Sequence, residues 1–467
     1  MAVPYNTSDQ TSFASTSARE RWPVIITQAI DDVYRTITQV DDKEKETEGK
    51  QIVEKISKLK YEVQHDRALT PIDDDGYPDI KLYNNRLQEL GAPTWLNCPW
   101  LYSECYLYRR ISSYFALSEH WKSYDIFRRQ KIKTFRSSRP AVFELAGRYR
   151  ELVGQLRADK NASHDEEAEK LLFTEMCEIC LWGNATDLSL LTSLTYEDIQ
   201  KLQGSEARKA SEKNILVNDL PEAYKVLKAA QAAGKKERRV DIVLDNAGFE
   251  LYVDLILAGY LLSSGLATHI VLHPKSIPWF VSDVLPGDFA QLLGAIASPK
   301  SFYETPSEDE KLQETVPAPV PEADLDNLAF LFQEWSQFHA EGQLILRPNR
   351  YWTHPDSFWT LPEAKELHED LKESELVIFK GDLNYRKLTN DAAWDPTTPF
   401  TESLQSLGPG SGVNVLALRT CKADVVVGLP AGKDEELRAM EGGGGDTGAR
   451  KWAWSGKWAV VSYSGGK

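Results

Sequence analysis

Cysteine is scarce in this sequence, and its scarcity excludes two kinds of protein. The chain of 467 residues has five cysteines, an odd number that suits free thiols in a reducing compartment better than a disulfide framework. Cys177 and Cys180 form one CxxC pair, but a zinc site would need a second pair or two histidines at ligand spacing, and neither is present. We therefore expect both thiols on a buried helix face.

The sequence also lacks a net positive charge and long apolar runs. The formal net charge of −16 at pH 7 argues against a nucleic-acid-binding surface, which needs a basic face. The most apolar run, "LYVDLILAGYLL", is too short for a transmembrane helix and contains Asp254, so no membrane partner is expected. The N-terminal stretch "MAVPYNTSDQTSFASTSARERW" has neither an apolar signal core nor an Arg-rich transit pattern. We expect a cytoplasmic or nuclear protein, with a monomer favoured.

The loops that bind nucleotides in other enzymes are missing too. The Gly-rich stretch "GGGGDTGARK" lacks the GxxxxGK[ST] spacing of a phosphate loop, and "GPGSG" lacks the GxGxxG spacing of a dinucleotide fold. No GxSxG and no HExxH motif is present. These absences exclude several common enzyme classes by their sequence signatures.

What is present is a helical half followed by an alternating half. Residues 1–210 have apolar residues at helical spacing and almost no strand signal. Beyond them, short β-rich runs alternate with helices, from "VDIVLD" through "ADVVVGLP" to "KWAVVSYS". This pattern predicts an N-terminal all-helical domain, residues 1–210, and a Rossmann-like α/β/α domain with a mainly parallel sheet, residues 211–467. The acidic, Pro-rich segment 298–324 should be a surface excursion.

The strongest polar feature is the pair Asp245–Asn246, which directly follows the buried run "VDIVL". Oxygen ligands at the carboxyl end of a buried strand suit a hard divalent cation, and the helix that starts near Ala247–Phe249 would favour an anion at its N-terminus. The alternative is an aspartate that caps the helix. The pair alone does not distinguish a metal site from a cap.

Polar residues at the ends of further strands favour the metal site. After "THIVLHPK" the chain reaches Asp283, which would open the next helix from the same sheet edge; His273 itself is either structural or part of the site. The strands ending in "IFKGDLNYRKL" and "LALRTCKAD" bring further polar residues to that edge: Lys380, Asp382, Asn384, Tyr385, Arg386, Arg419, Thr420 and Lys422. Two carboxylates and an amide for a metal, with arginine and lysine for a phosphate, are the apparatus of phosphoryl transfer.

These same motifs resemble a known family. "LDNAGFELYVDL", "HPKxxPWFVSD", "KGDLNYRKL" and "LRTCKAD" are similar to motifs of the metal-dependent damage-control phosphatases, in the eukaryotic subfamily marked by an RTxK motif. Upstream, "ECYLYRRI" and "LWGNATDLSLL" are similar to the helical signatures of that family. The resemblance covers nearly the whole chain and implies a helical N-terminal domain beside a Rossmann-like domain.

The resemblance also implies an activity and a set of site residues. It implies hydrolysis of sugar phosphates, such as fructose 1-phosphate and fructose 6-phosphate, with Mn, Ni, Co or Mg as the divalent metal cofactor. Position by position, it makes Asp245, Asn246 and Asp283 the metal ligands. It places Glu250, Lys422 and the segment Asp382, Leu383, Asn384, Tyr385 and Arg386 at the substrate. From its strand end we also expect Arg419 at the substrate, and we expect Asp245, Asn246, Asp283 and Lys422 to be the catalytic residues.

Two other functions and two mechanisms stay open at this point. Carboxyl methylation with S-adenosylmethionine is attached to the same family, but no Gly-rich nucleotide loop follows the first strand of the sheet domain. A non-catalytic sugar-phosphate-binding protein would keep the motifs without turnover. Either a metal-activated water or Asp245 itself would attack phosphorus, although Ala247 stands where a haloacid-dehalogenase-type nucleophile would need a second aspartate.

Overall fold

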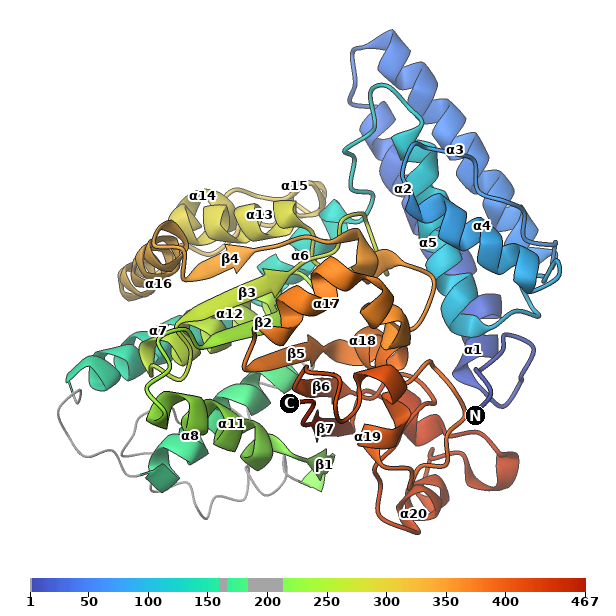
Figure 1. The fold of residues 1–467 in the computed structure, drawn as a ribbon. Coiled ribbons are helices and arrows are strands. Elements are labelled where there is room, and N and C mark those ends of the chain that lie inside the picture. Colours follow the sequence, from blue (N-terminus) through green and yellow to red (C-terminus); the bar gives the residue numbers. More distant parts are fainter. Residues whose placement is uncertain (1, 159–165, 184–212) are drawn as a thin grey trace.

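The computed structural model describes residues 2–158, 166–183 and 213–467 (Figure 1). Its first part is helical, as the sequence predicts. The helices there are α1 (Phe13–Thr16), the π-helix η1 (Ser17–Arg21), α2 (Trp22–Ile37), α3 (Lys43–Gln64), α4 (Asp79–Glu89), α5 (Trp100–Ala116), α6 (Arg128–Ser137), α7 (Arg139–Ala158) and α8 (Glu166–Trp182). Their amphipathic faces build a core of their own, to which Ile26, Val33, Ile56 and Leu59 of α2 and α3 belong.

The last two of these helices pack differently from the rest. Buried residues of α7 and α8 belong to the same hydrophobic core as one face of the sheet, whereas Phe127 is the last residue of the N-terminal helical region in the separate core. Phe135 of α6 already belongs to the sheet core, so the boundary between the two cores along the chain lies between Phe127 and Phe135. The domain boundary expected near residue 210 lies outside the described residues, as does most of the motif "LWGNATDLSLL".

The second part is a seven-stranded sheet in the order β1-β7-β6-β5-β2-β3-β4. The mixed α/β architecture and the mainly parallel sheet are thus confirmed: β7 runs antiparallel to β6, and β1 is parallel to β7, while the other neighbours are parallel. The strands are β1 (Ile215–Asn218), β2 (Arg239–Val243), β3 (His269–His273), β4 (Leu344–Leu346), β5 (Leu376–Lys380), β6 (Val415–Thr420) and β7 (Ala459–Ser464).

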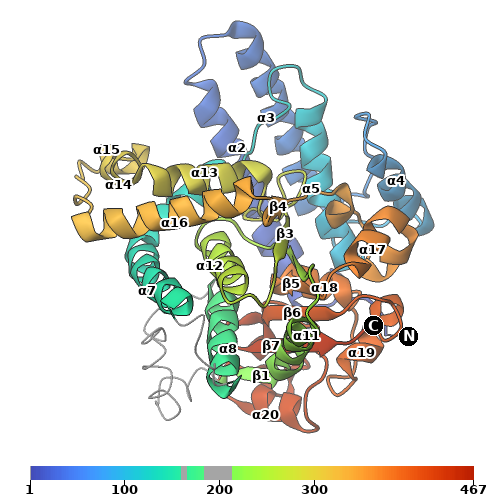
Figure 2. The same ribbon diagram turned by 60° about the vertical axis from the view of Figure 1, so that its left-hand side comes forward.

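Helices cover both faces of this sheet, because successive side chains of a strand point to opposite sides. Ile242 and Ile378 join the core beneath α7, α8 and α12, while Val243 and Phe379 join the core on the other face, with α17 and α18 (Figure 2). The helices of this part are α11 (Leu220–Ala232), α12 (Phe249–Ser263), α13 (Pro286–Ala297), α14 (Pro299–Glu304), α15 (Glu308–Leu312), α16 (Glu322–Ala340), α17 (Lys365–Lys372), α18 (Gly381–Leu388), α19 (Phe400–Ser403) and α20 (Lys433–Ala439). Short 3-10 turns are η4 (Arg350–Thr353), η5 (Phe358–Glu363), η6 (Gln405–Leu407), η7 (Gly445–Thr447) and η8 (Lys451–Trp454).

One expected strand is absent and one unexpected strand is present. The run "ADVVVGLP" is buried but forms no strand, because its backbone is satisfied by side chains: Arg419 donates to the carbonyls of Ala423 and Val425, and Val427 donates its N–H to the Tyr385 hydroxyl. Ile215–Asn218 instead supplies the edge strand beside β7. Its four residues are too few to give a recognisable alternation.

The Pro-rich segment 298–324 is a surface excursion with some structure. It includes α14 and α15, most of its residues are exposed, and it is fixed from beneath by two arginines. Arg136 donates to the Thr305 carbonyl at 3.1 Å, and Arg139 donates to the carbonyls of Ala318 and Pro319 at 2.7 Å. Within the described residues, no helix is long and apolar enough to cross a membrane.

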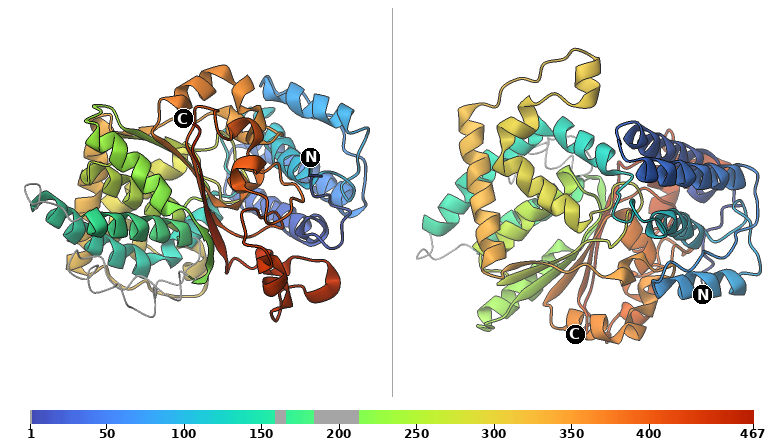
Figure 3. Two further views of the ribbon diagram at one scale, coloured as in Figure 1. Left: turned by 60° about the horizontal axis from the view of Figure 1, so that its bottom comes forward. Right: turned by 90° about the horizontal axis from the view of Figure 1, so that it is seen from above.

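The N-terminal helices dock against the segment that follows β4 (Figure 3). The Tyr83 hydroxyl donates to the Thr353 carbonyl at 2.6 Å, and Arg86 pairs with Asp356 at 2.6 Å. His354 lies between these two contacts, with its ring against the Tyr351 ring at 5.2 Å. Burial and the nearby Lys387 ammonium lower the pKa of His354 to about 4.

We expect this histidine to make the docking sensitive to acid. Unfolding returns its pKa to 6.5, so the unfolded chain binds the extra proton between pH 6.5 and 4. Stability is therefore full above pH 6.5 and is lost as pH falls through that window, by up to roughly 3 kcal/mol for a shift of this size. Urea unfolding of His354→Gln should show a weaker pH dependence between pH 6.5 and 4 than the wild type. His65→Gln, at an exposed position, should not.

Candidate active site

The candidate site lies where the chain reverses its direction of travel across the sheet. From β2 the chain moves outward to β3 and β4, then returns to place β5 on the other side of β2. The helices after β2 and β5 consequently lie on opposite faces, which opens a crevice at the carboxyl ends of these two strands. Val243 pairs with Phe379, so Asp245 comes directly beside Gly381.

The structure brings Asp245, Asn246 and Asp283 together. Asn246 and Asp283 form an isolated antiparallel bridge, and Val284 donates its N–H to the Asp245 carbonyl at 2.9 Å. The Asn246 amide donates to Asp245 Oδ2 at 2.6 Å and to Glu250 Oε2 at 2.7 Å. Gly248 is the N-cap of α12 and no side chain caps it, so the alternative role of Asp245 as a helix cap is ruled out.

Asp283 reaches this cluster from a strained connection and does not open a helix, contrary to expectation. The next helix, α13, begins at Pro286, and Asp288 accepts a hydrogen bond from the N–H of its N-cap, Leu285. Just before Ser282 and Asp283, Phe280 and Val281 have φ values of 43° and 69°, a left-handed conformation that is especially costly for the β-branched Val281. The strain directs Ser282 to the site, where its hydroxyl donates to Asn246 Oδ1 at 2.5 Å.

The cluster is buried and electrostatically frustrated. Burial and the carboxylates of Glu250 and Asp283 raise the pKa of Asp245 well above its usual value. Burial also raises the pKa of Asp283 to about 6, although the Lys275 ammonium, 3.1 Å from Asp283 Oδ2, opposes the rise. Lys422 acts on Asp245 in the same direction as Lys275. Three carboxylates share this crevice with only partial compensation.

The donor set fits a divalent cation. Asp283 Oδ2 receives no well-oriented hydrogen bond within the described residues, and the three carboxylates favour a further positive charge beside Lys275 and Lys422. Across the residues that the structure describes, no three histidine, cysteine, aspartate or glutamate side chains form a metal site by themselves. The Asn246 amide would therefore have to complete the ligand set, as two carboxylates and an amide do in the expected site.

The segment after β5 is placed beside the cluster, but its side chains have different surroundings. Asp382 accepts from Arg419 Nε at 2.8 Å and from the Lys422 N–H at 2.9 Å, which holds the end of β6 against α18. The Asn384 amide donates to the Lys380 carbonyl at 2.7 Å and to two carbonyls of the strand end at β2. Thr420 is buried in the β6–β7 ladder.

Three of the expected substrate residues are turned toward the protein. Arg386 pairs with Glu104 at 2.8 Å and Asp391 at 2.9 Å, so two carboxylates already balance its charge. Leu383 lies in the core of the N-terminal helices, and the ring of Tyr385 lies under the Arg419 guanidinium at 4.3 Å. Asp382 and Lys422 are the partly exposed members of the set, together with Asn246.

Comparison with known proteins now decides the family. The model of the damage-control phosphatase ARMT1-like domain matches residues 17–437. The chain belongs to this family. The protein named damage-control phosphatase ARMT1 is 36% identical in Xenopus laevis, over 97% of this chain and 96% of that protein. In Bos taurus it is 34% identical over 98% and 97%, and in Homo sapiens 32% identical over 99% of both.

Membership of the damage-control phosphatase family is what the sequence motifs predict, and that prediction is confirmed. One residue of the crevice was underestimated from the sequence. Lys380, buried at the end of β5, donates to Asp254 Oδ1 at 2.6 Å and to Glu250 Oε1 at 3.2 Å. Burial alone would lower its pKa, but the Asp254 and Glu250 carboxylates raise it well above the usual value. A lysine that ends a buried strand was the available signal.

Three residues considered from the sequence, His273, Cys177 and Cys180, are surrounded by protein and lie outside the metal cluster. His273 is buried with Nε2 at 2.6 Å from Asp241 Oδ1, and its ring lies 5.3 Å from the Trp352 ring, in the core of the opposite face. Cys177 and Cys180 are free and buried on α8, as expected for a helix face. The Cys180 thiol donates to Asp254 Oδ1 at 2.9 Å, so it belongs to the Lys380 network.

Proposed function

We propose that this protein is a metal-dependent phosphoric monoester hydrolase that acts on sugar phosphates such as fructose 1-phosphate and fructose 6-phosphate, in the removal of damaged or surplus phosphometabolites. The observation that carries the proposal is the convergence of Asp245, Asn246 and Asp283 at the reversal point of the sheet. Family membership supports the same activity.

Each residue of the crevice has a part in this proposal. Asp245, Asn246 and Asp283 would hold a divalent cation such as Mn, Ni, Co or Mg, which, when bound, supplies positive charge to the phosphate oxygens. Lys422, which follows β6, is partly exposed and within electrostatic reach of Asp245, and it binds the phosphate. Asp382, held by Arg419, accepts hydrogen bonds from sugar hydroxyls.

We infer that water, and not Asp245, attacks phosphorus. Asp245 Oδ2 already accepts the Asn246 amide, which fixes the carboxylate as part of the cluster. Ala247 stands at the position where a covalent aspartyl-phosphate mechanism would need its acid. Lys380 and Asn246 together hold Glu250 in the crevice, where it limits the space open to the ester.

The proposal is tested by phosphate release from a panel of sugar phosphates. We expect turnover with Mn, none with EDTA, and a loss of at least about a hundredfold in Asp245→Ala and Lys422→Ala, typical of removing a principal electrostatic group. The wild type should not need S-adenosylmethionine. Release that survives both EDTA and Asp245→Ala would contradict the metal site.

A further inference from the structure

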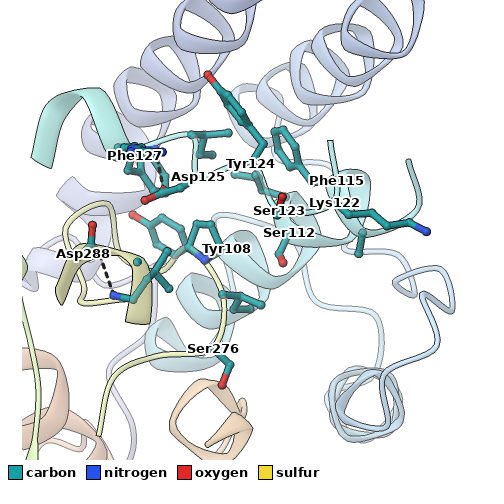
Figure 4. A pocket seen from close by; sticks show the side chains of 18 of the residues that line it. Tyr108, Ser112, Phe115, Lys122, Ser123, Tyr124, Asp125, Phe127, Ser276 and Asp288 are labelled. Atoms are coloured by element: carbon teal, nitrogen blue, oxygen red, sulfur yellow. Dashed lines mark hydrogen bonds between the residues drawn. The ribbon is translucent and has the colours of Figure 1, made fainter. Parts of the chain in front are cut away.

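A second cavity lies between the N-terminal helices and the connection from β3 to α13 (Figure 4). Its volume of about 830 Å³ falls within the range of sites for small ligands. One wall is α5 and the segment between α5 and α6, and the other consists of Ser276–Pro278 and the residues from Leu285 to Asp288. Asp245, Asn246 and Asp283 are not among its lining residues, so it is distinct from the metal crevice.

Tyr108 of α5 supplies an unused hydrogen-bond donor to this cavity. Only 3% of the residue is exposed, and it lines the cavity (Figure 4). Its hydroxyl makes no hydrogen bond within residues 2–158, 166–183 and 213–467, and the cavity that Tyr108 lines leaves room for a partner. Burial raises the pKa of Tyr108 well above its usual value, which keeps the hydroxyl protonated as a donor.

The cavity carries an excess of donors and positive charge. Its two carboxylates, Asp125 and Asp288, are both paired with Lys131, at 3.1 and 2.8 Å. Lys122 and Arg128 also line the cavity, are exposed, and have no carboxylate partner in the described parts of the chain. An anion would therefore meet two uncompensated cations at the rim and the Tyr108 donor deeper in.

The remaining lining is largely apolar, which indicates what the anion is attached to. The apolar side chains include Ile111, Phe115, Ile126, Phe127, Ile277 and Leu285. Such walls gain free energy by removing carbon surface from water, and they offer nothing to a bare inorganic ion. The occupant must combine an anionic group with a hydrocarbon or aromatic body.

We propose that this cavity is a second ligand site, which binds a small organic anion with a phosphate or carboxylate group on an apolar body. Lys122 and Arg128 bind the anionic group, the Tyr108 hydroxyl donates to the ligand, and the aromatic and aliphatic walls hold its body. The site goes beyond the proposed phosphatase activity and does not depend on it.

The cavity is also joined to the connection that carries Asp283. The Tyr108 ring stacks on Phe280, with centroids 4.8 Å apart and planes 25° apart, and it lies 6.0 Å from Trp279. A ligand in contact with Tyr108 would therefore lie one ring away from Phe280, which with Val281 forms the left-handed turn before Ser282 and Asp283.

The test is calorimetric titration of the full chain in EDTA with phenyl phosphate, with benzoate, and with neutral benzyl alcohol. We expect saturable binding of phenyl phosphate or benzoate, and none of benzyl alcohol. The double variant Lys122→Glu/Arg128→Glu should weaken binding at least about tenfold. Tyr108→Phe should weaken binding by about tenfold, within a factor of about three, which is the effect expected for the loss of one charge-assisted hydrogen bond. Lys58→Glu, an exposed lysine on α3, is the matched control.

Several results would overturn the site. The site would be refuted by a failure of both anions to bind, or by binding of benzyl alcohol as tight as that of the anions. It would equally be refuted if Tyr108→Phe and the charge reversals left the affinity unchanged, or if Lys58→Glu weakened the affinity as much as they do. Because Tyr108→Phe removes only an unpaired hydroxyl and Lys122 and Arg128 are exposed, the Tm of each of these variants should equal that of the wild type. The titration needs neither metal nor turnover, so a failed phosphatase assay leaves its outcome readable.

Discussion

The variant Gly381→Ala is expected to lose phosphatase activity by about a hundredfold or more, because a displacement of about 1 Å at a reacting centre has that effect. Gly381 has φ +80°, and a Cβ atom there would come within 2.0 Å of Asp245 Oδ2 and 2.7 Å of Asp245 Cβ. The carboxylate that anchors the proposed metal must move, and it is held on its other side by Asn246. The measurement is kcat/KM for fructose 6-phosphate with Mn.

Gly432→Ala is the matched control for this variant. Gly432 has the same φ of +80°, but no atom lies within 4 Å of an added Cβ. Both variants therefore carry the same backbone strain of about 1 kcal/mol, and only Gly381→Ala displaces Asp245. Equal activity in the two variants would show that Asp245 does not need its present position.

The variant Lys380→Met should lose about 3–5 kcal/mol of the free energy of unfolding, more than any other single substitution at this sheet edge. It removes the cation between Asp254 and Glu250 and leaves both carboxylates buried. Burial already raises the pKa of Asp254, and losing Lys380 raises it further. A carboxyl group with a raised folded pKa loses stability as pH rises, so the deficit of the variant should grow from pH 5 to pH 8.

The control for Lys380→Met is Lys50→Met. Lys50 lies 2.6 Å from Glu46, the same distance that joins Lys380 to Asp254, but the Lys50 side chain is 65% exposed whereas that of Lys380 is 1% exposed. A solvated pair of this kind contributes only about 0–1 kcal/mol. Urea unfolding of both variants separates burial from pairing. A similar small loss in both would mean that Lys380 is not needed to balance the buried carboxylates.

Much of the site is predictable because parallel strands end at one sheet edge. Asp245, Asn246, Asp382 and Lys422 follow strands that the sequence marks clearly, so the topology alone brings them together. What the pattern cannot specify is the direction of each side chain within the crevice.

The residues that differ from expectation are those whose partners lie far away in the sequence. Arg386 sits among polar residues of the strand end but pairs with Glu104 of a helix made 282 residues earlier. "ADVVVGLP" has the composition of a strand, yet Arg419 and Tyr385 bind its backbone groups before a ladder can. Composition and periodicity report local preference, and these outcomes depend on tertiary contacts.

The pairing of Glu104 with Arg386 has a consequence for the order in which the newly made chain can mature. At about 5–20 residues per second, the ribosome needs roughly 15–60 s to add the 282 residues that separate them. During that interval Glu104 has no Arg386 with which to pair. Leu383, a member of the core of those helices, arrives equally late. The core of the N-terminal helices is therefore completed only after more than four fifths of the chain has been synthesised.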